Sequence, residues 1–277
     1  MCIRDRGDAT GWKKPIFKKE HLEDLTNGWD LPVVFSFVCN TGDFDRENGK
    51  NCFAEELISL GSLNNPTGAV ADLNYFDKVV EFAKKWDVAI LHDACYTEVA
   101  FDGYKPPSFL QAKGAMDIGI EFHSMSKSYN MTGWRVGMAV GNQEIIEKLL
   151  VVKSNLDSGV PGSIQKMAIE AMRKPIQYVD ERNDIYQCRR DKVVKVLKEI
   201  GLTLESPKAS LYVWARVPDG LTSAKFAEQL LEERDVLMIP GGNYGVNGEG
   251  YVRLSLTLED DKIDEALTRI SGWHPLS

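Results

Sequence analysis

The sequence predicts an α/β fold, and two observations carry the prediction. Apolar runs at 88–93, 118–122 and 136–140 are typical of strands in a sheet that is covered on both faces. Ahead of the first run, Asp72 is placed to cap a helix whose apolar residues recur at helical spacing. Those residues are Leu73, Phe76, Val79, Val80 and Ala83. Strands that alternate with helices are typical of α/β folds, in which ligands bind outside the carboxyl ends of the strands.

The pattern changes after residue 177, where a smaller α+β domain is predicted. A long helix is expected from 178 to 200, because Gly201 ends its periodic pattern. Other helices are expected at 143–153, 163–173, 223–233 and 259–271, and strands at 211–217, 236–240 and 251–257. We therefore expect a large domain at 61–177 and a small domain at 178–277, which the long helix enters.

Composition excludes several classes of protein. The net charge of −8 argues against nucleic acid or an anionic membrane as the main partner. No apolar run approaches the roughly 20 residues of a membrane span. The cysteines are scattered and form no CxxC pair, which predicts reduced thiols in a cytoplasmic protein. His92 and His123 belong to no Cys/His cluster, so we expect no metal site. The cysteines are Cys2, Cys39, Cys52, Cys95 and Cys188.

Residues 122–135, FHSMSKSYNMTGWR, contain the clearest candidate for chemistry. Lys127 lies among small hydroxyl side chains directly after a predicted buried strand. If it is desolvated there, its amine loses its proton more easily and can attack a carbonyl to form a Schiff base. Arg135, eight residues further on, offers a planar fork suited to a phosphate or a carboxylate. The alternative is a solvated lysine in a polar loop, which remains open on this stretch alone.

Other short motifs occur in a fixed order around this stretch. They are NNPTG at 64–68, DACY at 93–96, SMSK at 124–127 with Arg135, and Arg253 in YVRLS. As a set they resemble the class I and II, fold-type I pyridoxal-phosphate-dependent aminotransferases, over roughly residues 60–277. Stretches such as NNPTGAVADL, FDGYKPPSF and PKASLYVWARVP are most similar to LL-diaminopimelate aminotransferases. The resemblance implies a large pyridoxal-phosphate-binding α/β domain followed by a small α+β domain.

The resemblance implies a role for each motif residue at the cofactor ring. Pyridoxal phosphate acts as an electron sink that the protein orients and tunes. Lys127 would hold its aldehyde and, once freed, would move a proton at the substrate's α-carbon. Asp93 would pair with the pyridine nitrogen and keep it protonated. Tyr96 and Asn65 would hydrogen-bond the phenolic oxygen, and Asn65 would also lie at the substrate.

Two further anion sites follow from the resemblance. Ser124, Ser126 and Arg135 would hold the cofactor's phosphate, and Arg253 would bind the α-carboxylate of the substrate. Alternation along 251–257 puts Arg253 on one face of its strand with Tyr251 and Ser255. The opposite face, with Val252, Leu254 and Leu256, should pack on the helix at 259–271. Arg253 would then point towards the cleft between the domains.

Residues 1–60 depart from the family pattern. A buried strand is expected at 31–39 and a loop at 40–51. However, the family's N-terminal arm, its Gly/Ser turn at the phosphate and its ring-stacking aromatic residue are not recognisable here. Too few strands precede residue 88 to complete the large sheet. We therefore expect residues 1–60 to be an irregular remnant of a truncated or rearranged N-terminal region, and the large domain to be incomplete.

The expected function is transfer of an amino group from an amino acid to a 2-oxo acid, by a homodimer if the protein is complete. Two alternatives remain open. A pyridoxal-phosphate-dependent lyase would use the same lysine, and a non-catalytic truncated homologue would at most associate with a full-length subunit. The missing N-terminal features favour the non-catalytic homologue, whereas Lys127, Asp93, Tyr96 and Arg253 favour an enzyme.

Overall fold

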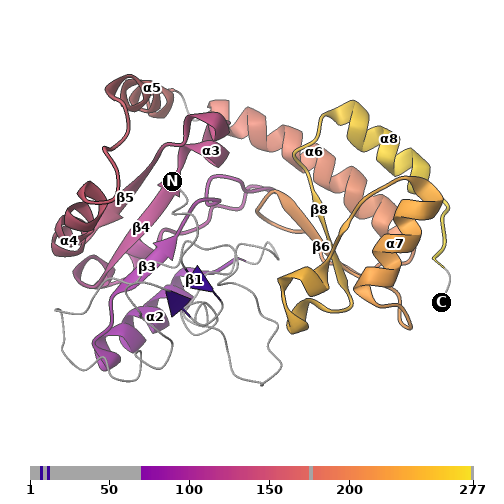
Figure 1. The fold of residues 1–277 in the computed structure, drawn as a ribbon, viewed down its shortest axis with the longest axis horizontal. Coiled ribbons are helices and arrows are strands. Elements are labelled where there is room, and N and C mark those ends of the chain that lie inside the picture. The colour runs from indigo at the N-terminus through magenta and orange to yellow at the C-terminus, as the bar shows by residue number, and fades with distance from the viewer. Residues whose placement is uncertain (1–6, 9–10, 13–69, 175–176, 276–277) are drawn as a thin grey trace.

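The structure is a computed structural model that describes residues 7–8, 11–12, 70–174 and 177–275 (Figure 1). The predicted strand at 31–39, the loop at 40–51 and the NNPTG turn with Asn65 lie outside these residues. Strands β1 (Gly7–Asp8) and β2 (Gly11–Trp12) form a short antiparallel pair. Two three-stranded sheets and the helices around them make up the rest of the described chain.

The first sheet has the strand order β3-β4-β5. Its strands are β3 (Ile90–Asp93), β4 (Gly119–Ser124) and β5 (Gly137–Gly141). β3 and β4 run parallel, with Asp93 opposite Phe122, so the carboxyl ends of both strands lie at the same edge. β5 pairs antiparallel with β4. The mixed α/β sheet that the sequence predicts is present, and it brings the ends of the DACY and SMSK strands together.

Burial of this sheet differs from the prediction. β4 begins with three buried residues, but β3 alternates and β5 contains no buried residue. The prediction of three strands buried on both faces is therefore wrong for β3 and β5. Among the described residues β5 pairs only with β4, and Val140 is 37% exposed. An apolar run indicates that its residues favour a core, but it does not show which elements cover the strand.

Helix α2 (Leu73–Trp86) packs on the first sheet as its sequence predicts. Asp72 caps it, because the carboxylate accepts a hydrogen bond from the backbone N–H of Tyr75 at 2.8 Å. Four residues of its predicted apolar face are buried, whereas Leu73, in the first turn, is 41% exposed. The buried four are Phe76, Val79, Val80 and Ala83, and they form a core with Ile90, Phe109 and Ile118.

The helices predicted between the two sheets are confirmed. They are α4 (Gln143–Ser154), α5 (Gly162–Met172) and α6 (Gln177–Glu199). α6 extends from the first sheet to the second, and Gly201 follows it in a left-handed conformation (φ 93°), as expected for the glycine after a helix (Figure 1). Within the described residues, no helix combines the length and hydropathy needed to cross a membrane.

The second sheet is antiparallel, with the order β6-β8-β7. It contains β6 (Tyr212–Arg216), β7 (Ile239–Pro240) and β8 (Tyr251–Ser255), and α7 (Ser223–Arg234) and α8 (Asp260–Ile270) pack on it. β7 begins three residues later than the strand predicted at 236–240, and it ends at Pro240 as predicted, where a 3-10 turn starts at Gly241. Val252 and Leu256 are buried in one core with Ile263 and Leu267, so the predicted packing of the apolar β8 face on the last helix is confirmed.

The second core also takes in residues from the chain that follows β3. Val99 and Phe101 are fully buried within it, and Ala100 forms an isolated bridge with Ala209. Asp102 pairs with Arg190 of α6 at 2.6 Å. The segment after Asp93 therefore connects the two sheets, although it precedes the predicted domain boundary at 177, which stays a prediction.

Candidate active site

Three of the predicted catalytic residues meet at the carboxyl edge of the β3–β4 pair. Asp93 ends β3, and its carboxylate accepts a hydrogen bond from the backbone N–H of Cys95 at 3.2 Å. The tight turn that follows brings Tyr96 back over this edge. β4 leads directly into the single-turn helix α3 (Met125–Ser128), which carries Lys127. The Lys127 Nζ lies 5.5 Å from the centre of the Tyr96 ring.

The electrostatics around Cys95 agree with this convergence. Burial raises the pKa of the Cys95 thiol, and the carboxylate of Asp93 raises that pKa further, whereas Lys127 lowers it. Cys95 therefore lies near enough to both Asp93 and Lys127 for each of them to shift its pKa. Burial also raises the pKa of Tyr96, and a hydrogen bond with Tyr212 raises it again. The Tyr96 phenol is thus held in its neutral form, which can donate a hydrogen bond.

The predicted phosphate-binding residues surround α3. Ser124 caps this helix, and its hydroxyl accepts a hydrogen bond from the N–H of Ser126 at 3.3 Å. Ser126 is buried, and its carbonyl accepts a hydrogen bond from Thr132. The N–H of Met125 donates to the carbonyl of Val136 at 3.2 Å, so the chain after Arg135 lies beside the start of α3.

Arg135 precedes Val136 in the chain, but no hydrogen bond from its side chain to Ser124 or Ser126 is seen among the described residues. Its backbone is left-handed (φ 50°), its side chain is exposed, and its Nη1 donates to the carbonyl of Thr132 at 3.1 Å. Asn65, the remaining predicted cofactor ligand, lies outside the described residues.

Arg253 comes from the second sheet and is held between two aromatic rings. Its guanidinium lies 4.1 Å from the centre of the Tyr212 ring and 4.4 Å from that of Tyr244. Tyr212 in turn contacts Tyr96, with ring centres 6.1 Å apart. A continuous series of contacts therefore links Lys127, Tyr96, Tyr212 and Arg253 across the two sheets. This arrangement carries Arg253 towards the first sheet, on the side of β8 that the alternation predicts.

Tyr212 and Tyr244 were not singled out from the sequence. The alternation of aromatic and small side chains in the strand at 211–217 is a signal for Tyr212, because it puts Tyr212 and Trp214 on the face opposite the core. Tyr244 has no such signal, because it lies in a Gly-rich loop. That loop folds into 3-10 turns, and Trp214 packs edge-on against Tyr244 with ring centres 5.8 Å apart.

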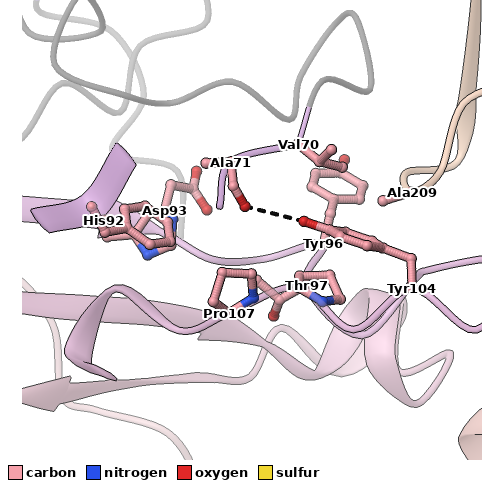
Figure 2. A pocket seen from close by; sticks show the side chains of 11 residues that line it. Val70, Ala71, His92, Asp93, Tyr96, Thr97, Tyr104, Pro107 and Ala209 are labelled. Atoms are coloured by element: carbon pink, nitrogen blue, oxygen red, sulfur yellow. Dashed lines mark hydrogen bonds between the residues drawn. The ribbon is translucent and has the colours of Figure 1, made fainter. Parts of the chain in front are cut away.

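A pocket opens beside these groups (Figure 2). Val70, Ala71, Asp93 and Tyr96 are among the residues that line it. The hydroxyl of Tyr104 donates to the carbonyl of Ala71 at 3.1 Å, which ties the chain directly after the NNPTG turn to the pocket wall. Lys127 is not part of the lining.

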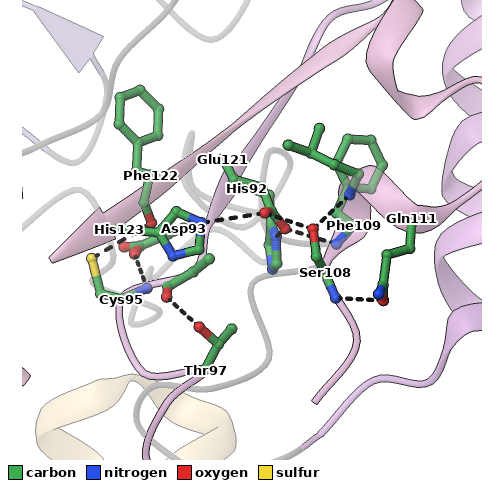
Figure 3. A network of polar contacts seen from close by, with 12 residues as sticks. His92, Asp93, Cys95, Thr97, Ser108, Phe109, Gln111, Glu121, Phe122 and His123 are labelled. Atoms are coloured by element: carbon green, nitrogen blue, oxygen red, sulfur yellow. Dashed lines mark hydrogen bonds and ion pairs between the residues drawn. The ribbon is translucent and has the colours of Figure 1, made fainter. Parts of the chain in front are cut away.

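Next to this pocket, the two histidines share one buried carboxylate (Figure 3). Glu121 lies 2.8 Å from His92 Nδ1 and 3.3 Å from His123 Nε2. It also accepts hydrogen bonds from the hydroxyl of Ser108 and the N–H of Phe109. Among the residues that the structure describes, no group of three or more His, Cys, Asp or Glu side chains could hold a metal ion. Through Glu121 of β4, His92 anchors β3, and Ser108 and Phe109 anchor the 108–111 turn.

The donor set fits pyridoxal phosphate. The amine of Lys127, the carboxylate of Asp93 and the neutral phenol of Tyr96 lie together at one sheet edge. These groups match the aldehyde, the pyridine nitrogen and the phenolic oxygen of that cofactor. The hydroxyl groups of Ser124 and Ser126 lie along the chain next to the amine, as a phosphate would require, whereas the guanidinium of Arg135 donates to Thr132.

Comparison with known proteins gives the same answer. The family model for "Aminotransferase class I and II" matches residues 38–270, so the similarity begins upstream of residue 60. An LL-diaminopimelate aminotransferase from Dehalococcoides mccartyi is 55% identical over 278 residues, which cover 98% of this chain and 71% of that protein. The enzyme of the same name from Moorella thermoacetica is 50% identical, again over 98% of this chain and over 70% of its own length.

Solved structures agree on the fold. An aminotransferase from Staphylococcus aureus superimposes with a TM-score of 0.70 at 38% identity, over 74% of this chain and 55% of that chain. A probable N-succinyldiaminopimelate aminotransferase from Thermus thermophilus gives 0.69 at 35% identity, over 74% and 55%. The chain spans little more than half the length of these structures. Its fold is that of the fold-type I, pyridoxal-phosphate-dependent transferases, and the chain belongs to the class I and II aminotransferase family.

Proposed function

We propose that this protein transfers an amino group from an amino acid to a 2-oxo acid with pyridoxal phosphate bound to Lys127. We further propose LL-diaminopimelate as the amino donor, because the relatives at 55% and 50% identity are named for that compound. The observation that carries the proposal is the approach of Lys127 Nζ to the Tyr96 ring, at 5.5 Å, beside the carboxylate that ends β3.

Each residue has a part in holding the cofactor. The Lys127 amine binds the aldehyde, Asp93 pairs with the pyridine nitrogen, and Tyr96 donates to the phenolic oxygen together with Asn65. Ser124, Ser126 and Arg135 bind the phosphate. The bound cofactor supplies an electron sink for the substrate's α-carbon.

The same residues act on the substrate. The Lys127 Nζ would move the proton of the substrate's α-carbon. Arg253 binds the α-carboxylate, and Asn65 lies nearby. Because the rings of Tyr212 and Tyr244 both contact the guanidinium, the planar fork is oriented before the substrate arrives.

We also propose that the protein is a homodimer and resides in the cytoplasm. Exposed apolar side chains on α4 and in the chain after it, among them Leu150, Val151 and Leu156, support an interface between subunits. Cys95 and Cys188 are free thiols, which supports a reducing compartment.

The test is an assay of the purified chain with pyridoxal phosphate, a panel of amino acids that includes LL-diaminopimelate, and a panel of 2-oxo acids. We expect consumption of LL-diaminopimelate that requires a 2-oxo acid and produces the matching new amino acid. Release of ammonia without a 2-oxo acid would indicate a lyase instead. If the cofactor binds and no amino donor reacts, the chain is a non-catalytic homologue.

A further inference from the structure

Arg182, in the second turn of α6, connects this helix to both chain segments that form the site. Its side chain is only 5% exposed. The Nη1 donates to the backbone carbonyl of Lys127 at 2.9 Å and to that of Ser128. The Nη2 donates to the carbonyl of Glu98 at 2.6 Å, in the segment directly after Tyr96. One guanidinium therefore joins the lysine helix to the turn that carries the phenol.

This use of a buried charge is unusual. Within the described residues, the Arg182 guanidinium donates to no carboxylate, and its Nε has no hydrogen-bond partner. Burial lowers the pKa of this guanidinium, which reflects the unfavourable free energy of desolvating it. Arg182 instead directs its donors at backbone carbonyls of the site.

Helix α3 needs such an external contact. It consists of a single turn, and a helix this short has little stability of its own. Its last carbonyls lack partners within the helix, and Arg182 supplies donors to two of them. Tyr178 of α6 adds a second contact, because its ring stacks on that of Tyr129 at 6.3 Å with an interplanar angle of 8°. The first turns of α6 thus fix the end of α3.

We propose that Arg182 is a positioning residue that holds Lys127 at its distance from Tyr96. The inference rests on the proposed function, since it concerns the lysine that binds the cofactor. Because α6 continues into the core of the second sheet, where Val193 and Leu197 are fully buried, the placement of Lys127 is also coupled to that region.

Arg190 provides a matched control on the same helix. It is 2% exposed and donates to Asp102 at 2.6 and 2.9 Å, but none of its hydrogen bonds reaches α3. Arg190→Gln should therefore lower the melting temperature without changing Lys127. Arg182→Gln removes the donors to three backbone carbonyls, and Arg182→Lys keeps a single point of donation.

Two measurements test the proposal on the full chain. The first is the rate at which added pyridoxal phosphate is captured on Lys127, with the site identified by borohydride reduction and peptide mapping. The second is amide hydrogen exchange at Tyr129 and Met131, whose N–H groups donate to the carbonyl of Met125. For Arg182→Gln we expect capture about 10-fold slower and faster exchange at both amides. Arg182→Lys should give intermediate values, and Arg190→Gln wild-type values.

The outcomes separate this inference from the proposed function. If wild-type protein captures the cofactor on Lys127 and both Arg182 variants match it, the positioning role is wrong and the proposed function stands. Equal effects of Arg182→Gln and Arg190→Gln would show a general loss of stability and would also overturn the inference. If wild-type protein captures no cofactor, the proposed function fails, and the exchange measurement still decides whether Arg182 holds α3. Should Arg182→Gln not fold, a wild-type capture rate and exchange for Arg182→Lys would overturn the inference.

Discussion

The two sheets bury their apolar side chains in different ways. Around the second sheet, residues from α6, α7, α8 and the strands form one continuous core in which Phe226, Leu230 and Ile270 are fully buried. Around the first sheet, the described residues form two smaller clusters, and α4 leaves Leu150 and Val151 exposed. Lys127 and Asp93 belong to the first region, and Arg253 belongs to the second.

This difference indicates which contacts keep the residues of the candidate site in place. The groups proposed to bind the cofactor lie on short elements, a single helical turn and the end of a strand, whereas the arginine proposed to bind the substrate lies on a strand that is packed against a large core. Contacts that cross between the regions therefore carry the geometry of the site. They are the Tyr96–Tyr212 ring contact and the Arg182 hydrogen bonds.

The largest expected effect is a difference in the free energy of unfolding between the same leucine-to-alanine substitution made in each region. Leu230 of α7 is 0% exposed, and Leu150 of α4 is 62% exposed. Leu230→Ala should lower the free energy of unfolding by about 2–5 kcal/mol, because it leaves a cavity in the core. Leu150→Ala should change it by less than about 0.5 kcal/mol. Denaturant unfolding of both variants measures this, and equal losses would show that α4 is buried in solution.

The next effect concerns the chemistry of the first region. Asp93→Asn keeps an oxygen that can accept the hydrogen bond from the Cys95 N–H, so the turn should persist. An amide cannot balance a charge on the pyridine nitrogen, so turnover should fall roughly 100-fold. Steady-state kinetics and cofactor titration measure the two quantities separately, with Asp117→Asn as an exposed control. Equal losses of turnover and cofactor affinity would indicate a structural role for Asp93.

Arg253→Lys tests the second region, with a smaller expected effect. A lysine cannot reproduce the bidentate fork or pack flat between Tyr212 and Tyr244. Amino-acid binding should weaken about 10-fold, while cofactor binding barely changes. Arg216→Lys is the control, because Arg216 lies on the neighbouring strand β6, is exposed and pairs with Asp219. If titration shows unaltered amino-acid affinity, Arg253 is a structural residue of β8 and the carboxylate binds elsewhere.

The smallest effect is the pH dependence of stability in the first region. Burial raises the pKa of Glu121, but hydrogen bonds from His123, His92 and Ser108 outweigh burial, and the net pKa is lowered. That contribution is present above the ordinary pKa of 4.5 and is lost as the pH falls through the lowered value. The hydrogen bond to Glu121 raises the pKa of His123, so its contribution is present below 6.5 and is lost as the pH rises through the raised value.

Stability of this region should therefore be greatest between about pH 4.5 and 6.5. His123→Gln should remove the decline on the alkaline side, a change of less than about 1 kcal/mol because His123 is partly exposed. Denaturant unfolding from pH 4 to 9 measures it, and an unchanged alkaline decline in His123→Gln would assign that decline to another group.

Much of the fold follows from local patterns in the sequence. The cap at Asp72, the buried face of α2 and the β8 alternation around Arg253 each depend on neighbours within a few residues, and each was predictable. The meeting of Asp93 with Lys127 was also predictable, since parallel strands end at one edge. The roles of these site residues remain proposals.

Long-range features were not predictable from the sequence. The apolar run of β5 gave no indication that the strand contains no buried residue, because burial depends on which elements cover a strand. Arg182 lies in a charged stretch of α6 and resembles a solvated residue, yet its partners are 55 and 84 residues away. Tyr212 lies in the second sheet and Tyr96 in the turn after β3 of the first, so only the tertiary structure shows their contact.

The most direct test of the account is the position of the captured cofactor. Wild-type protein should be incubated with pyridoxal phosphate, reduced with borohydride and digested, and the labelled peptide identified. We expect the label on Lys127 alone and its complete loss in Lys127→Ala, while Lys105→Ala, in the loop of residues 101–108, stays labelled as in wild type. A label on another lysine, or one that persists in Lys127→Ala, would contradict the assignment of Lys127 as the cofactor-binding residue.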